Sequence, residues 1–467
     1  MGSILNYNDT SIPALTSLER IGPKGYLRYV FPFQLAEDYK IDEVATVLRT
    51  GYDALKNRIP VVACEAVPDL KSKQAGVLKL QRLDGSDIED IVVKDLRNSD
   101  AFPQQYSELK EKAFPVAAFD ADILCRRSVW PSPGERLPIS LVQANFIRGG
   151  LILTWCIFHM VGDGTSFYTW TKVWADECRR ALQDSIEPVH LDEAIWRDRS
   201  RMMMPSGRNP GSLKSHPEYT LLPFTPAGAP PKMLSPHHRG QVFYFSPAAL
   251  KALKAEASPA RAIVPSDQSW ISTNDALSAL LWRTVMAVQS PLDTLEGDPV
   301  SVFNIAINGR KRTDPPVHPE TQGCFLEYIA VSLPIREILG SRNLADLAIL
   351  IRKAVLRADN QYTDDVMSLV EQLEDIDRLV PTGFLDVPGF NCLLSSWVGF
   401  ELYELEWGSL LGRTKAVRTP SVGAINGLQI VLPPLPDGGV EILIGVEERC
   451  LGRLLEEPLW MKYAVAR

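Results

Sequence analysis

The stretch GGLILTWCIFHMVGDGTSFYTWTKVWADECRRAL, Gly149 to Leu182, carries the strongest pattern in the chain. Its apolar run from Leu151 to Phe158 has the length and composition of a strand buried on both faces. A histidine, His159, ends that run. Aromatic residues then recur at helical spacing beyond a Gly-Asp-Gly turn, so the second half of the stretch predicts a helix with one apolar face.

The turn between this strand and this helix has signals of its own. Gly162 and Gly164 bracket Asp163, and glycine adopts backbone conformations that other residues resist. Thr165 and Ser166 follow, and both residue types are common N-caps. We therefore expect a sharp turn after the strand and a helix capped by Thr165 or Ser166.

The histidine at the end of the strand is the first candidate functional residue. Imidazole is the only side chain whose unperturbed pKa, about 6.5, lies near neutrality. His159 is therefore suited to take a proton from a hydroxyl or an amine. The alternative is a core histidine whose two nitrogens are satisfied by neighbouring groups. The glycine-bracketed Asp163, four residues later, favours a general base but leaves the alternative open.

Length and composition indicate an ordinary globular protein. At about 100–200 residues per domain, two or three domains are expected, and the chain has 467 residues, of which 45% are hydrophobic and 23% charged. The net charge is −8, with acidic and basic residues mixed along the chain. A nucleic-acid surface needs clustered basic residues, so no nucleic-acid partner is expected.

Cysteine spacing and hydropathy indicate the cellular compartment of the protein. The seven cysteines are scattered, odd in number and without a CxxC pair. Neither a disulfide framework nor a zinc site is expected, and a reducing compartment suits the pattern. The N-terminal residues lack the pattern of a signal peptide, and no apolar run approaches the ~18 residues of a membrane helix. We expect a cytoplasmic protein with no metal and no membrane contact.

The residues before the central stretch predict an α/β domain. Tyr26 to Phe33 is typical of a strand, interrupted by Pro32. Ile41 to Leu55 places its apolar residues on one helical face. A turn follows, and Val61 to Ala66 predicts the next strand.

A change in composition divides the chain. Met202 to Gly240 is rich in Pro, Gly and Ser and has no sustained periodicity, which favours a linker or a long surface crossover. The expected organisation is an N-terminal domain, a linker and a C-terminal domain. These comprise residues 1–205, 206–240 and 241–467.

Three segments of the second half stand out. The predicted strand Val302 to Ile307 runs into the basic turn NGRKR, Asn308 to Arg312. The segment FNCLLSSWV, Phe390 to Val398, predicts another strand. ELYELEWGSLLGRTKAVRTP covers Glu401 to Pro420. Taken singly, these are a basic turn, a strand end with a core tryptophan, and a loop.

Taken together, the segments resemble the BAHD acyltransferases and the wider chloramphenicol acetyltransferase-like superfamily. HMVGDG, His159 to Gly164, matches the family motif HxxxDG, and NGRKR resembles the family's D/N-G-R-x-R segment. STNDALSALLWR, Ser272 to Arg283, and the segment 401–420 resemble fungal trichothecene 3-O-acetyltransferase-like enzymes. Within the DFGWG-like signature Gly408 matches, whereas Glu406 replaces the aspartate.

The resemblance implies an α/β fold of two chloramphenicol-acetyltransferase-like domains, with mixed sheets and a channel between them. His159 would lie midway along that channel. Arg310 would hold Asp163 through a bidentate ion pair, so that Asp163 orients the loop and does not touch substrate. Glu406 and Gly408 would have structural roles.

The resemblance also implies acyl transfer from an acyl-CoA, with acetyl-CoA as the expected donor, to a small-molecule alcohol or amine of fungal specialised metabolism. His159 would remove the acceptor proton, and transfer would be direct, without a covalent enzyme intermediate. An oxyanion then needs preorganised donors. The Ser395 hydroxyl and the Trp397 indole or backbone N–H are the candidates. A monomer without a permanently bound cofactor is expected.

Two alternatives stay open. One is a condensation- or cyclisation-type enzyme of the same fold that acts on carrier-bound or intramolecular substrates. Such enzymes carry HHxxxDG, and here Phe158 replaces the first histidine. The other is a non-catalytic descendant that binds a ligand in the channel. The departures at Glu406 and Leu410 leave room for that descendant, whereas the retained His159, Asp163 and Arg310 disfavour it.

Overall fold

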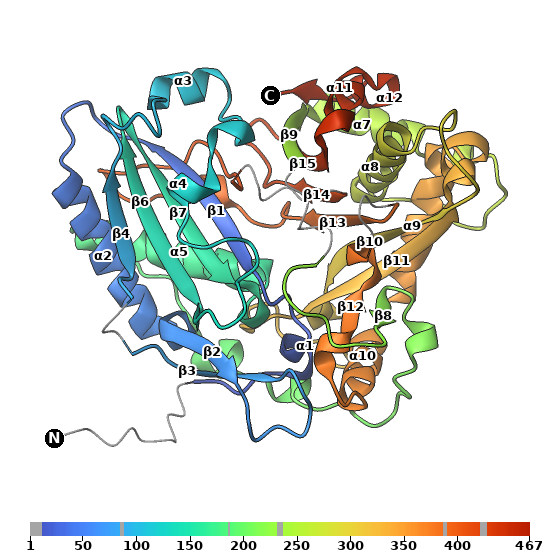
Figure 1. The fold of residues 1–467 in the computed structure, drawn as a ribbon, viewed down its shortest axis with the longest axis horizontal. Helices are drawn as coiled ribbons and strands as arrows, with labels where there is room; N and C mark the ends of the chain where they lie inside the picture. The colour runs from blue at the N-terminus through green and yellow to red at the C-terminus, as the bar shows by residue number, and fades with distance from the viewer. Residues whose placement is uncertain (1–11, 85–87, 185–186, 231–236, 386–389, 421–426) are drawn as a thin grey trace.

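The computed structural model consists of two halves, each built on its own β-sheet, with the N-terminal half on the left of Figure 1. Strands and helices mix in both halves, so the α/β fold class predicted from the sequence is confirmed. The residues that the structure describes are 12–84, 88–184, 187–230, 237–385, 390–420 and 427–467.

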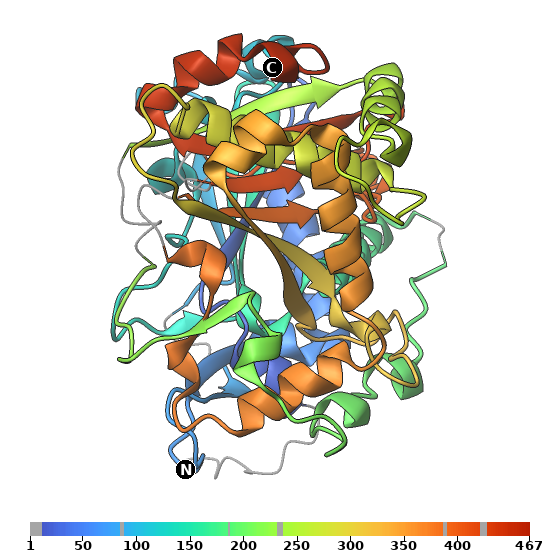
Figure 2. The same ribbon diagram turned by 90° about the vertical axis from the view of Figure 1, so that its right-hand side faces the viewer.

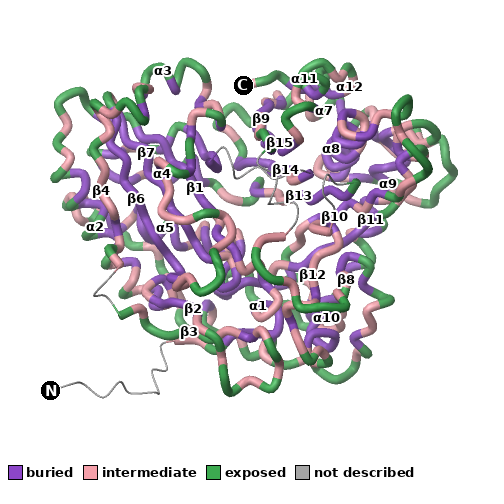
Figure 3. Tube along the Cα trace, in the orientation of Figure 1, coloured by how far each residue is buried: buried purple, intermediate pink, exposed green. Residues whose placement is uncertain are grey.

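The first half contains a four-stranded sheet in the order β1-β7-β6-β4. The strands β1, β6 and β7 are buried along most of their length (Figure 3). Two long helices, α2 and α5, cover one face, where the Trp174 indole packs edge-on at 5.1 Å from the Trp155 ring and donates to the Leu48 carbonyl at 3.1 Å. These elements are β1 (Tyr26–Gln34), β4 (Ile91–Asp95), β6 (Ser140–Ile147), β7 (Gly150–Phe158), α2 (Ile41–Arg58) and α5 (Gly164–Ala181).

Smaller elements complete this half. A separate three-stranded sheet has the order β3-β2-β5. Short helices lie in the connecting segments. The bounds of these elements are α1 (Ser17–Arg20), β2 (Cys64–Pro68), β3 (Leu78–Arg82), α3 (Tyr106–Glu111), α4 (Ala121–Leu124), β5 (Leu137–Pro138) and α6 (Glu193–Trp196).

Strand β1 runs through Pro32 without a break, so the predicted interruption is wrong. Pro32 pairs with Ile152 of β7 in the regular antiparallel register. The backbone N–H and C=O of Val30 both bond to Arg418 on the opposite edge. Because alternate residues direct their backbone groups to the same edge, Pro32 also faces outward. There only its carbonyl is used, by the Lys415 N–H, and a proline at such a position loses no bond to β7.

The second half contains a seven-stranded mixed sheet in the order β11-β10-β13-β14-β15-β9-β16. The contacts β10–β13 and β13–β14 are parallel, and the remaining contacts are antiparallel. Helices α8 and α9 pack beside each other in this half, which faces the viewer in Figure 2. The strands are β9 (His238–Phe245), β10 (Val300–Asn308), β11 (Leu326–Pro334), β13 (Cys392–Ser396), β14 (Leu428–Val431), β15 (Val440–Glu447) and β16 (Val465–Ala466).

The helices of this half begin at residues with good capping chemistry. Ser272 forms a reciprocal capping box with Asp275 at the start of α8, which satisfies two otherwise unpaired backbone donors. Pro247 occupies the first position of α7 behind the N-cap Ser246. The bounds are α7 (Pro247–Glu256), α8 (Thr273–Gln289), α9 (Leu344–Arg357), α10 (Tyr362–Glu371), α11 (Glu448–Glu456) and α12 (Pro458–Met461).

The predicted linker, 206–240, is bound to the second half along part of its length. It contributes a short strand, β8 (Tyr219–Leu221), which pairs with β12 (Leu379–Pro381). His216 is buried and bonds to Glu218 at 3.0 Å and Asp365 at 2.9 Å. Burial lowers the pKa of His216, but these two carboxylates more than offset that effect and leave the pKa raised. The division into domains at 205 and 241 stays a prediction.

One segment of the C-terminal part crosses to the first half. The Trp407 indole packs at 5.4 Å from the Phe33 ring and at 5.2 Å from the Trp174 ring. Gly408 has a φ of +93°, and a Cβ there would lie 2.5 Å from the Leu182 side chain. Only glycine fits both constraints. Glu406 lies at the surface and pairs with Arg413, and its structural role stays a prediction.

Arg418 fastens this crossing segment from inside the molecule. Its guanidinium is 2% exposed and binds the Glu441 carboxylate of β15 at 2.6 and 2.9 Å. It also donates to the carbonyls of Ala113 and Phe114 in the first half, both at 2.9 Å. One side chain therefore links β15 of the second half to a loop of the first half.

None of the described helices is both long and apolar enough to cross a membrane. All seven cysteines lie within the described residues, and none of them forms a disulfide.

We expect Arg418→Met to lower the free energy of unfolding by about 3–5 kcal/mol, because the substitution leaves Glu441 buried without its principal partner. Arg413→Met is the matched control: it breaks only exposed ion pairs with Glu404 and Glu406, which are worth at most about 1 kcal/mol. Urea unfolding of both variants measures the difference. Equal unfolding midpoints would contradict the role given to Arg418.

Candidate active site

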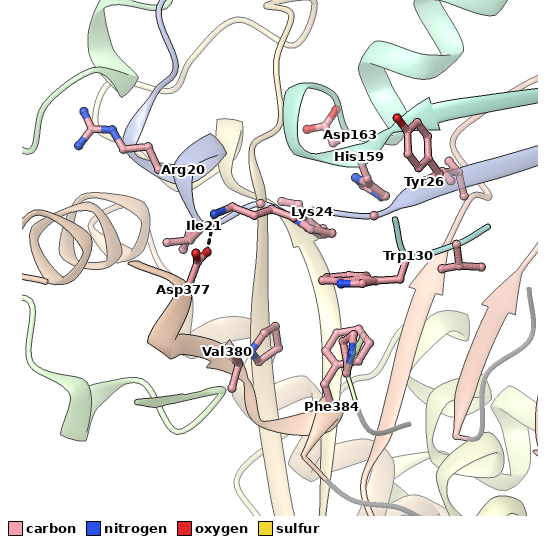
Figure 4. Close-up of a pocket in the computed structure, with 18 of the residues that line it drawn as sticks. Arg20, Ile21, Lys24, Tyr26, Trp130, His159, Asp163, Asp377, Val380 and Phe384 are labelled. Carbon is pink, nitrogen blue, oxygen red and sulfur yellow. Dashed lines mark hydrogen bonds and ion pairs between the residues drawn. The ribbon is translucent and has the colours of Figure 1, made fainter. Parts of the chain in front are cut away.

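A cavity of about 1810 Å³ lies between the two halves. Tyr26 and Trp130 of the first half face Val380 and Phe384 of the second across it (Figure 4). The exposed side chain of Phe224 also lines the cavity, so the space reaches the surface. Most of the wall is apolar, which suits a site that binds a small organic molecule.

His159 is at the wall of this cavity. Strand β7 ends at Phe158, and the next residue, His159, starts a single 3₁₀ turn. The His159 backbone N–H donates to the Gly25 carbonyl at 2.8 Å. The imidazole packs edge-on against the Phe167 ring at 5.3 Å. Its side chain faces the cavity in Figure 4, so the strand brings an imidazole to the space between the halves, as the sequence predicts.

The pKa of His159 is lowered from its usual value of 6.5. Burial is the largest cause, and backbone hydrogen bonding within the turn and the charge of Asp163 oppose it in part. Because burial disfavours the charged form, the imidazole is neutral at pH 7. Nδ1 is fully buried, so Nε2 is the nitrogen available to a bound molecule.

Asp163, and not Thr165 or Ser166, is the N-cap of helix α5. Its Oδ1 accepts from the Ser166 N–H at 3.2 Å, and α5 begins at Gly164. The prediction of a cap at Thr165 or Ser166 is therefore wrong by two or three residues. The carboxylate of an aspartate satisfies an unpaired N–H at the helix start just as a hydroxyl does.

The two glycines of the turn are needed for space and not for unusual dihedral angles. Neither has a positive φ. A Cβ at Gly162 would lie 2.5 Å from the Phe167 ring, and a Cβ at Gly164 would lie 2.5 Å from the Phe400 ring. The backbone of the turn therefore packs directly against aromatic side chains from both halves.

The structure brings Asp163 and Arg310 together in a buried ion pair. Arg310 Nη1 donates to Asp163 Oδ2 at 2.5 Å, and Nη2 donates to Oδ1 at 3.2 Å. The Phe325 N–H bonds to Oδ2 at 3.0 Å. With the Ser166 N–H, the carboxylate accepts four hydrogen bonds. Both oxygens are thus engaged in holding the turn.

Arg310 is satisfied in turn. It is 0% exposed, and its Nε donates to the Thr321 carbonyl at 2.9 Å. Its other nitrogens reach Gly323 O at 3.1 Å and Asn308 Oδ1 at 3.2 Å, and the guanidinium lies 4.3 Å from the centre of the Phe325 ring. A buried charge is tolerated only when it is paired and hydrogen-bonded in this way.

Ser395 and Trp397 line the same cavity from strand β13 and the turn after it. The Trp397 indole N–H donates to Ser395 Oγ at 3.0 Å, and its backbone N–H donates to the Val431 carbonyl at 2.8 Å. Both N–H groups of Trp397 are thus engaged, so the geometry does not support its predicted role as an oxyanion donor. The indole instead orients the Ser395 hydroxyl, whose proton stays available.

Sequence reasoning missed an ion pair that links the halves across the cavity. Lys24, before β1, pairs with Asp377 of the second half (Figure 4) and also donates to the Gly76 carbonyl at 2.6 Å. In the sequence, the single lysine of GPKGY has no pattern that would distinguish it from an ordinary surface lysine. The indole of Trp130, also missed, lies at the cavity wall nearby.

Among the residues that the structure describes, no group of three or more His, Cys, Asp or Glu side chains could hold a metal ion.

Comparison with known families decides the class of the protein. The model described as "Transferase family" matches residues 107–457, and that described as "Trichothecene 3-O-acetyltransferase-like N-terminal domain" matches residues 26–178. The chain belongs to the Transferase family. The resemblance to BAHD acyltransferases is thus confirmed, and the chain is an acyltransferase.

Curated relatives of this family member come from fungi. Eremophilane O-acetyltransferase prx11 of Penicillium rubens is 27% identical over 97% of this chain and 98% of its own length. Trichothecene 3-O-acetyltransferase TRI101 of Fusarium sporotrichioides is 25% identical over 94% of this chain and 93% of its own. The enoyl-CoA isomerase/hydratase claC of Penicillium crustosum is 26% identical over 95% of this chain, which spans only 50% of claC.

Among solved structures, the fold matches TRI101 of F. graminearum in its complex with coenzyme A and deoxynivalenol. The TM-score is 0.83, with 23% sequence identity over 97% of this chain and 99% of that one. The expected fold, with mixed sheets in a two-domain arrangement of the chloramphenicol acetyltransferase type, is thereby confirmed. The roles of the individual site residues stay predictions.

We expect Asp163→Asn to lower the free energy of unfolding by about 3–5 kcal/mol, because the amide keeps the helix cap but leaves Arg310 buried without a counter-charge. Asp267→Asn, which removes the exposed partner of Lys353, is the control, with a change of at most about 1 kcal/mol. Thermal or urea unfolding compares the two. An Asp163→Asn protein as stable as the control would show that the buried ion pair contributes nothing.

Proposed function

We propose that the protein transfers an acyl group from a coenzyme A thioester to a hydroxyl group of a small-molecule acceptor, with His159 as general base. The observation that carries the proposal is a neutral imidazole at the wall of the cavity between the halves. The neighbouring acid, Asp163, is fully engaged by Arg310 and its turn. It supports the base and does not compete with it.

The names of the relatives support the nature of the two substrates. Prx11 is an eremophilane O-acetyltransferase, and the matching TRI101 structure contains coenzyme A together with deoxynivalenol. From these names we infer an acetyl group as donor and a hydroxyl, in preference to an amine, as acceptor. The size and the apolar wall of the cavity suit an acceptor of this kind.

In the proposed mechanism both substrates are bound in the cavity at once. Nε2 of His159 accepts the proton as the acceptor oxygen attacks the thioester carbonyl. The Ser395 hydroxyl, held by the Trp397 indole, donates to the oxyanion of the tetrahedral intermediate. When the intermediate collapses, the C–S bond breaks and the imidazolium returns its proton to the thiolate, giving free coenzyme A. Acyl group, proton and electron pair are all accounted for without a covalent enzyme intermediate.

We expect His159→Ala to lower kcat for acetyl transfer by about 10²–10⁴-fold, the usual contribution of a general base. The measurement is thiol release from acetyl-CoA in the presence of fungal terpenoid and polyketide alcohols, with the acylated product identified by mass spectrometry. His190→Ala, which changes an exposed histidine, is the matched control and should keep full activity. A His159→Ala enzyme as active as the control would exclude the mechanism.

The pH dependence of kcat/KM tests the state of the imidazole. Since burial lowers the pKa of His159 below 6.5, the active neutral form persists below that pH. The acid limb of log(kcat/KM) should therefore have its midpoint below pH 6.5, with activity lost on acidification and not on raising the pH through neutrality. A midpoint above 6.5 would mean that a neighbouring group stabilises the imidazolium, contrary to this site.

A further inference from the structure

Arg28 is a buried cation on the cavity wall that the mechanism above does not use. It lies on β1 opposite Cys156 of β7, in the middle of an otherwise apolar strand. The residue is 4% exposed and belongs to the lining of the cavity. Arginine is almost never buried to this degree unless it is paired.

The guanidinium of Arg28 lacks the hydrogen bonds that a buried arginine requires. Its Nε and Nη2 are buried and have no hydrogen-bond partner, and Nη1 makes only a long contact of 3.4 Å with the Arg127 carbonyl. The buried guanidinia of Arg310 and Arg418, by contrast, donate from every nitrogen. Each unsatisfied buried donor in a native protein calls for an explanation.

No carboxylate neutralises Arg28 within the described part of the chain. The adjacent Arg127 is paired with Glu135 at 3.1 Å, so that acid is already in use. Cys156, which lies opposite Arg28 on β7, carries a thiol. A hydrogen bond from Cys125 and the charge of Arg28 lower the pKa of that thiol to about 7. A buried thiol is not equivalent to the paired carboxylate that a buried guanidinium needs.

Two further polar atoms without a partner belong to residues that line the same cavity. The hydroxyl groups of Ser396 and Thr419 are buried, unbonded and part of the cavity lining. Val30 of β1 forms a bridge with Arg418 in antiparallel sense. That register places Thr419 beside the residues that flank Arg28 on the strand. A buried cation and two unbonded hydroxyl groups therefore belong to the lining of one cavity.

We propose that Arg28 binds a carboxylate group of the acceptor, so that the acceptor is a hydroxy acid with an apolar body. This inference rests on the proposed acyl-transfer function, of which it names the acceptor class. Arg28 and His159 both belong to the lining of this cavity. One ligand can therefore reach both groups while its apolar part contacts walls such as Leu27 and Trp130.

The chemistry of the guanidinium favours a carboxylate. Its planar fork binds both oxygens of a carboxylate at once, and such charge-assisted pairs are about twice as strong as neutral hydrogen bonds. A coenzyme A phosphate is the other available anion. It is doubly charged and strongly hydrated, whereas Arg28 is almost completely removed from solvent. A carboxylate carried in by an apolar molecule suits the buried position better.

Benzoate and its neutral analogue benzamide test the proposal on the intact protein. We expect benzoate to bind the wild-type protein in calorimetry, with at least about tenfold weaker binding to Arg28→Met, as expected for loss of a charge-assisted contact. Benzamide should bind both proteins weakly and equally. Arg127→Met, which removes a neighbouring guanidinium that is already paired, should bind benzoate like the wild type. Should Arg28→Met fail to fold, Arg28→Lys replaces it, with weaker benzoate binding expected because the planar fork is lost.

Three results would overturn the assignment: equal benzoate affinity with and without the Arg28 guanidinium, benzamide binding as tightly as benzoate, or a tenfold loss of coenzyme A affinity in Arg28→Met. The last result would assign Arg28 to a phosphate. His159→Ala protein should bind benzoate like the wild type. If benzoate binding depends on Arg28 but no acyl transfer is found, the anion site stands and only the proposed reaction fails.

Discussion

The buried ion pair between Asp163 and Arg310 is the constraint on which the site depends. Its acid belongs to the first half, its base to the second, and both side chains are removed from solvent and fully hydrogen-bonded. Breaking such a pair is strongly unfavourable because each partner would be left as an isolated buried charge. The pair therefore fixes the turn after β7 against the second sheet. The imidazole, four residues before the aspartate, is thereby held at the boundary between the halves.

Other contacts act on the same boundary in different ways. Lys24 and Asp377 join the halves at the cavity. The segment around Trp407 and Arg418 leaves the second sheet and completes the core of the first. The cavity persists between these connections because its rim is held from several sides. A site held in this way can keep polar residues, such as Ser395 and Arg28, in the lining of a mainly apolar cavity at the expense of local stability.

The sequence predicted those parts of the site that follow from local chemistry. The apolar run of β7 and the HxxxDG motif located His159, and the resemblance of NGRKR to a family segment paired Arg310 with Asp163. The predicted position of the α5 N-cap was wrong because Asp, Thr and Ser are nearly equivalent as N-caps. Pro32 was misjudged because its effect depends on which edge of β1 is paired. The environments of Trp397 and Arg28 depend on contacts between residues distant in the sequence and could not be predicted from local pattern. An arginine within the apolar segment YLRYVF could nevertheless have indicated a functional position.

The crossing segment also bears on how the chain matures. During synthesis the first 200 residues leave the ribosome well before Trp407, and translation at about 5–20 residues per second separates the two events by tens of seconds. Throughout that interval the rings of Phe33 and Trp174 lack the Trp407 side chain that packs against them in the folded protein. The nascent first half then exposes hydrophobic surface and is prone to aggregate. We expect it to depend on chaperones until the rest of the chain has been synthesised.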